Sequence, residues 1–93
     1  MIVGTLKIHI IVPWSHSLKE KRMVLRSIID KVRNKFNVSI AEVEDQDLHQ
    51  SIVLGIACVT NQTSHANSIL QKVIDYIGNT TEAEIIDTFI EIL

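Results

Sequence analysis

The 93-residue sequence contains one cysteine, one proline, three glycines and four aromatic residues. A single cysteine excludes an internal disulfide, which fits a chain that folds in a reducing compartment. The scarcity of proline and glycine excludes linkers and low-complexity segments. No N-terminal stretch looks like a signal peptide, and no apolar run reaches the roughly 18 residues of a membrane span. We therefore expect one cytoplasmic domain over residues 1–93, with no membrane association.

Groups that carry catalytic or metal chemistry are also sparse. Glycine-rich phosphate-binding loops are absent, and adjacent Ser15, His16 and Ser17 have no acid partner evident in the sequence. Neighbours in sequence rarely face one another productively, so we interpret these three as loop and cap residues. The four histidines lack the spacing of a metal site: His9, His16, His49 and His65. We expect no catalytic residue, no cofactor and no bound metal.

Charge is segregated along a chain whose net charge is only −2. Residues 19–35 hold seven of the nine lysines and arginines, against Glu20 and Asp30 alone. Residues 42–47 hold four carboxylates and no cation. Segregation within a nearly neutral chain favours a localised docking patch over attraction by the whole molecule.

Hydrophobic periodicity predicts four strands and two helices. Period-two alternation predicts a strand over residues 2–12, and helical spacing predicts a helix from about Leu18 to Phe36. The other predicted elements are strands over 38–44, 51–60 and 83–93, and a helix after Asn61–Ser64 that stops at Gly78-Asn79. With right-handed crossovers, this order predicts an α+β, ferredoxin-like βαββαβ fold. Its four-stranded antiparallel sheet has the order 4-1-3-2, with both helices on one face.

That architecture leaves one face of the sheet uncovered. The strand over 51–60 is apolar on both faces, and the strand over 83–93 carries two alternating apolar sets. Whichever set points away from the helices is partly exposed, and apolar surfaces of this size often mark interfaces. We expect a homodimer that packs through the sheet or through the last strand, which would also bury a free edge. The alternative is an exposed surface without a partner.

The most informative stretch opens the first helix. Residues 17–20 fit a capping box, in which the Ser17 hydroxyl accepts from the Glu20 N–H and the Glu20 carboxylate reaches the Ser17 N–H. Three cations then lie at the positive end of the helix dipole: Lys19, Lys21 and Arg22. Exposed cations there cost about 0.3–1 kcal/mol each. Such a placement predicts an anion at the helix start, most naturally a phosphate.

The same helix carries a basic flank. Lys19, Arg22, Arg26 and Arg33 share it at offsets of three, four and seven residues. Together with Ser17 and Lys21, they form the predicted phosphate or RNA site; the alternative is a solvated face that only aids solubility. Trp14 could stack on a base or plug the end of the core, and we favour the plug. The strands over 2–12 and 51–60 contain no aromatic residue, so RNA would not be read from the sheet.

The strand that ends at Pro13, followed by Ser17-Leu18-Lys19-Glu20-Lys21-Arg22, resembles the small bacterial YlxP-like proteins (domain of unknown function 503). The resemblance extends over the whole chain. It implies a ferredoxin-like fold and a cytoplasmic setting near translation, because these genes often neighbour those of translation initiation and ribosome maturation. It brings no catalytic residue. We expect a non-catalytic protein that binds RNA or a ribosomal subunit through the basic flank. The alternative is a homodimeric interaction or regulatory domain that binds an acidic partner or a small anion.

Overall fold

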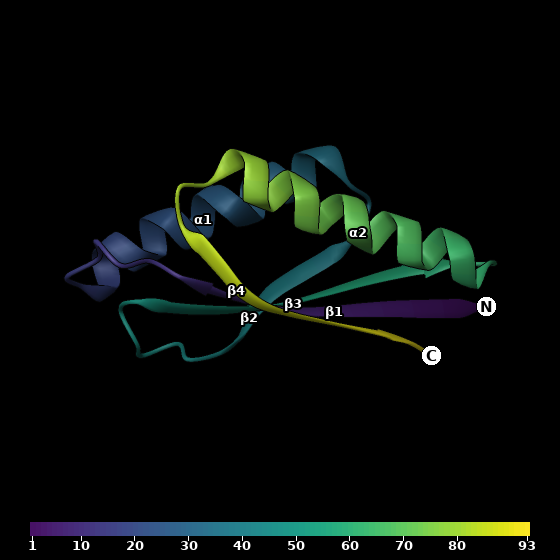
Figure 1. Cartoon of the computed structure of the whole chain (residues 1–93), viewed down its shortest axis with the longest axis horizontal. Coiled ribbons are helices and arrows are strands. Elements are labelled where there is room, and N and C mark those ends of the chain that lie inside the picture. The colour runs from purple at the N-terminus through teal and green to yellow at the C-terminus, as the bar shows by residue number, and fades with distance from the viewer.

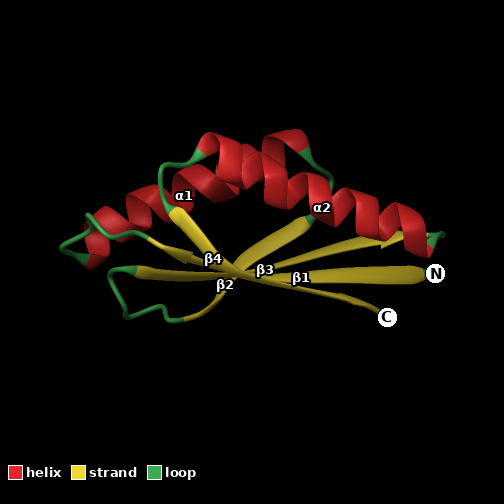
Figure 2. Ribbon diagram, viewed as in Figure 1, coloured by secondary structure: helices red, strands yellow, loops and turns green.

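The structure is a computed structural model that describes residues 1–93 (Figure 1). The strands are β1 (Ile2–Ile11), β2 (Ser39–Glu44), β3 (Ser51–Thr60) and β4 (Glu84–Ile92), and the helices are α1 (Leu18–Lys35) and α2 (Thr63–Thr80). The strands form one antiparallel sheet in the order β2-β3-β1-β4. Both helices cover the same face of it (Figure 2). The predicted βαββαβ arrangement and its strand order are confirmed.

The core lies between the sheet and the helices. Alternation along β1 turns Leu6, Ile8 and Ile10 toward the helices, where each is almost fully buried. Their partners come from β3 and α2: Ile52, Leu54, Ile56, Leu70, Val73 and Ile77. Full burial of such a side chain stabilises the fold by about 1.5–3 kcal/mol. The period-two and helical patterns of the sequence therefore identify this layer correctly.

Helix α2 ends later than the sequence predicts. It continues through Gly78 and Asn79 to Thr80, and the N–H of Thr81 closes it by donating to the carbonyl of Ile77. A glycine ends a helix readily when it adopts a positive φ, but Gly78 does not. The expected stop at Gly78-Asn79 is therefore wrong.

Helical spacing in the sequence predicts that one apolar stripe of α1 is buried, formed by Leu18, Leu25, Ile29, Val32 and Phe36 with Ile28 on its edge, and the helix is rotated relative to that stripe. Its buried positions are Lys21, Ile28 and Val32, which are spaced by seven and four residues and share one face. Leu25 and Ile29, which the sequence places in the centre of that stripe, are only partly buried. A lysine thus occupies a position in the helix–sheet interface that the sequence assigns to the solvent.

Two loops meet at one end of the sheet, opposite the two termini (Figure 1). The segment between β1 and α1 lies beside the loop between β2 and β3. The N–H of Val12 donates to the Gln50 carbonyl, and the Gln50 side chain donates to the carbonyls of Pro13 and Ser15. These contacts fix the start of α1. Neither helix combines the length and the apolarity that a membrane crossing requires.

Candidate nucleic-acid interface

The cap of α1 forms much as predicted. Ser17 Oγ accepts a hydrogen bond from the Glu20 N–H at 3.1 Å. The Glu20 carboxylate reaches back to the N–H of His16, at 3.3 Å, instead of the N–H of Ser17. Glu20 therefore places a negative charge at the helix start, where the sequence suggested a bound phosphate. The Ser17 oxygen is therefore already the acceptor of the Glu20 N–H, and the Glu20 carboxylate opposes the binding of an anion at the helix start.

Lys21 does not face the solvent. Its ammonium lies 2.9 Å from Glu42 Oε2 and donates to the carbonyls of Asp45 at 2.7 Å and Gln46 at 3.2 Å. The residue is 0% exposed, so a phosphate cannot reach it, and the prediction that Lys21 binds RNA is wrong. A buried ammonium is tolerated only when its charge and its donors find partners. The acidic end of β2 and the loop after it supply them.

The other predicted cations remain on the surface. Four exposed residues of α1 take part in no ion pair: Lys19, Arg22, Arg26 and Arg33. The ion pairs of the protein lie elsewhere, in Lys7 with Glu44 and in Lys21 with Glu42, and His9 Nε2 lies 3.9 Å from Asp45 Oδ2. The helix flank therefore presents positive charge that the folded chain does not neutralise with its own carboxylates.

Three of these cations line one groove. Arg22, Arg26 and Arg33 border a surface groove of about 350 Å³, which we call the arginine groove; its other lining residues are Leu25, Ile29 and Asp30. Leu25 and Ile29 are partly buried and form an apolar floor. Arg33 Nη2 donates to the carbonyl of Ile40 at 3.3 Å, which fixes the groove beside β2. Lys19 lies beyond the N-terminal end of the groove.

The remaining cations of α1 lie on its opposite flank, toward α2. Lys31 Nζ donates to the Thr80 carbonyl at 3.3 Å, and Lys35 Nζ lies 5.2 Å from the centre of the Tyr76 ring. The seven cations counted in the sequence thus divide into a buried one and two separate flanks. Only the flank beside β2 forms a groove lined by arginines.

Trp14 is separated from the arginine groove. It is 44% exposed and borders a different groove, between α1 and the segment that joins α2 to β4. Met23 and Ser27 line that groove, and at 100° per residue they lie on another side of the helix from Arg22. Trp14 therefore covers the end of the core only in part, and it cannot extend the arginine groove as a stacking platform.

A polar network at the loop end of the sheet was not predicted from the sequence. His9 Nε2 lies 2.7 Å from Ser51 Oγ, and Ser51 donates to Asp45 Oδ2 at 2.7 Å. Because the single hydroxyl proton of Ser51 goes to Asp45, His9 must be the donor in its own contact. The histidine is thus not placed to take the serine proton, and the network ties the β2–β3 loop to β1. Only the pairing of β1 with β3 brings these residues together, so no local motif reveals them.

Comparison with known proteins supports the same fold and identifies the family. Residues 3–90 match the family model described as "Protein of unknown function (DUF503)". The chain belongs to the DUF503 family. The DUF503 chain is 40% identical over 83 residues to the uncharacterized protein YlxP of Bacillus subtilis (strain 168), across 89% of this chain and 90% of YlxP. The resemblance to the YlxP-like proteins is therefore confirmed.

A solved structure resembles this DUF503 chain in fold. The solution NMR structure of the de novo designed protein LFR1 1, which has a ferredoxin fold, gives a TM-score of 0.64. The alignment covers 98% of this chain and 86% of the designed one, at 16% sequence identity. At that identity the similarity concerns the fold alone, and it confirms the ferredoxin-like arrangement.

Proposed function

We propose that this protein is a non-catalytic, cytoplasmic RNA-binding protein that contacts RNA phosphates through the arginine groove, in free structured RNA or within a ribosomal subunit. The observation that supports this proposal is that Arg22, Arg26 and Arg33 line one groove and form no ion pair, with Asp30 as the only carboxylate that lines the groove beside them. A guanidinium offers a planar set of donors that matches two phosphate oxygens. Lys19 adds a further charge at the end of the groove.

The spacing of the arginines suits a chain of phosphates better than one small anion. At about 1.5 Å of rise per residue, Arg22 and Arg26 are about 6 Å apart along the helix axis, and Arg33 follows after about 10 Å more. A single phosphate cannot contact all three. Arg33 uses one nitrogen for the Ile40 carbonyl and retains further donors. Contacts of this kind position a protein on RNA and carry little sequence information.

The test compares two charge-reversed variants of α1 that change the net charge equally. Arg22→Glu/Arg26→Glu alters the arginine groove, and Lys31→Glu/Lys35→Glu alters the opposite flank. Binding of purified ribosomal RNA is measured by filter retention at low salt, and helicity by circular dichroism. We expect the first variant to bind at least about tenfold more weakly and the second to bind like the unmodified protein.

Equal weakening in both variants would show that only overall charge matters and would overturn the assignment to the arginine groove. Absence of RNA binding by the unmodified protein would overturn the proposed function itself. If one acidic protein is retained after nuclease treatment and is lost with Arg22→Glu/Arg26→Glu, the groove serves the alternative partner that the sequence leaves open.

A further inference from the structure

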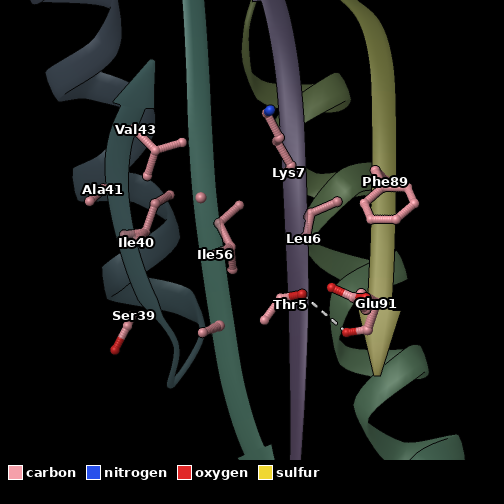
Figure 3. A pocket seen from close by; sticks show the side chains of 12 residues that line it. Thr5, Leu6, Lys7, Ser39, Ile40, Ala41, Val43, Ile56, Phe89 and Glu91 are labelled. Carbon is pink, nitrogen blue, oxygen red and sulfur yellow. Dashed lines mark hydrogen bonds between the residues drawn. The ribbon is translucent and has the colours of Figure 1, made fainter. Parts of the chain in front are cut away.

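The sheet face without helices, here called the open face, contains a broad depression. It has a volume of about 490 Å³ and crosses the middle of the sheet (Figure 3). Small residues make its floor, among them Gly55 and Ala57 of β3. Val43 of β2 stands at one side and Phe89 of β4 at the other. A large apolar side chain and an apolar hollow thus occur on the same face.

Strand register relates the hollow to the protruding ring. Lys7 of β1 is paired with Gly55 on one side and with Phe89 on the other, so these three form one row across the sheet. Adjacent strands are about 4.8 Å apart, so the missing side chain of Gly55 and the ring of Phe89 lie at equal distances from β1.

A second row also has β1 at its centre. Val3 of β1 pairs with Val59 of β3 and exchanges backbone hydrogen bonds with Leu93, the residue after β4. Val59 is 67% exposed and Leu93 is 66% exposed. This row, unlike the first, has an exposed apolar side chain on each side of β1.

We infer that the open face binds a second copy of this chain, sheet against sheet, about a two-fold axis that runs along β1. This rotation exchanges the β3 side of one copy with the β4 side of the other. It places Phe89 over the partner subunit's Gly55, and Leu93 over the partner subunit's Val59. Sheets packed in this aligned manner lie about 10 Å apart, with strands within about 30° of one another.

Val43 completes the seat for the incoming ring. A Cβ added to Gly55 would lie 2.8 Å from Val43 Cγ1, so the Val43 side chain packs closely beside the glycine. Figure 3 shows the Val43 side chain directed from β2 toward β3. Val43 is 47% exposed and Phe89 is 61% exposed, which leaves both in water in a single chain. The partner subunit's Phe89 would pack on Val43 and Ala57, and both surfaces would lose contact with water. Gly55 makes this possible because any larger residue would displace Val43.

The salt dependence of the proposed dimer should differ from that of RNA binding. Asp87 and Glu91 flank Phe89 on β4 and take part in no ion pair. The rotation places β4 of one copy over β3 of the other, so the β4 carboxylates of the two copies stay on opposite sides of the axis, about 14 Å apart. That separation exceeds the screening length at physiological salt, so salt should change the dimer little. RNA binding through arginines should weaken steeply as salt rises, so the two proposals succeed or fail separately.

Sedimentation velocity over a wide concentration range tests the inference with two variants of β4. Phe89→Asp should leave the protein monomeric at concentrations where the unmodified chain is dimeric. Ile86→Asp is the matched control, because Ile86 is also exposed on β4 but lies at its bulge and outside the depression. A dimer that persists in Phe89→Asp, or an unmodified protein that is monomeric throughout, would overturn the inference. A dimer that is lost equally in both variants would also overturn it.

The axis is tested by chemical cross-linking. A Lys7→Cys variant should be joined to its copy by a bismaleimide that spans about 10 Å, because the axis along β1 places the two positions opposite each other. The native Cys58 is buried and leaves the new thiol as the reactive one. A dimer that fails to cross-link through position 7 would exclude this axis.

Discussion

The ammonium of Lys21 lies 2.9 Å from the carboxylate of Glu42, and the lysine is completely enclosed. The pair joins the first turn of α1 to β2. Two further bonds, to the carbonyls of Asp45 and Gln46, extend the contact into the next loop. No hydrogen bond of regular geometry reaches Glu42 Oε2, so its contact with Lys21 is mainly one of charge. The basic start of α1 and the acidic segment after it are therefore parts of one structural contact.

Removal of this lysine should destabilise the fold strongly. Lys21→Ala leaves the Glu42 carboxylate without its partner in a mostly buried site, and a broken buried pair costs about 3–5 kcal/mol. Lys19→Ala is the control, because Lys19 is exposed and unpaired and should change the free energy of unfolding by less than about 0.5 kcal/mol. Urea denaturation measures both. Equal midpoints in the two variants would contradict the structural role of Lys21.

Loss of the Ser17 cap of α1 should destabilise the protein less than loss of Lys21. Ser17→Ala removes the acceptor of the Glu20 N–H, which should lower the free energy of unfolding by about 1 kcal/mol. Ser27→Ala, on the exposed surface of α1, should be neutral or slightly stabilising because alanine favours a helix. Thermal unfolding followed by circular dichroism distinguishes the two. A Ser17→Ala protein as stable as Ser27→Ala would show that another group caps α1.

Two glycine-to-alanine substitutions should change the stability of the protein in opposite directions. A Cβ on buried Gly4 would lie 3.1 Å from atoms of Cys58, Ala66 and Leu70, so Gly4→Ala should destabilise the protein by about 1–3 kcal/mol. Gly78 is exposed within α2, and a Cβ there meets only Ile85, at 3.7 Å. Gly78→Ala should therefore stabilise by about 0.5–1 kcal/mol. Urea midpoints that shift in the same direction for both variants would contradict these placements.

Salt should weaken RNA binding, and the steepness of that weakening should report the number of phosphate contacts. If the arginine groove contacts three phosphates, the logarithm of affinity should fall against the logarithm of salt with a slope of about −2 to −3. Arg26→Ala should make that slope shallower by about 1. Lys35→Ala, on the flank that faces α2, should leave the slope unchanged. Identical slopes in Arg26→Ala and Lys35→Ala would place the RNA elsewhere on the protein.

The fold could be predicted almost entirely because its signals are local. Alternation marks β1, and helical spacing marks α1 and α2. The β-α-β-β-α-β order then fixes the sheet through the handedness of its crossovers. The cap at Ser17 could also be predicted, because its partner is three residues away. The end of α2 could not be predicted, because a glycine such as Gly78 can either end a helix or continue it.

Within the candidate site, the sequence alone determined that Arg22, Arg26 and Arg33 share a helix flank, since periodicity decides which residues of a helix are neighbours. Only the tertiary structure decided that Lys21 leaves that set. Its acceptors Asp45 and Gln46 are 24 and 25 residues away, and they are brought to it by the pairing of β2 with β3. A lysine side chain is stable either in water or in the interior beside a carboxylate. Which environment it has depends on the distant segment that the fold places beside it.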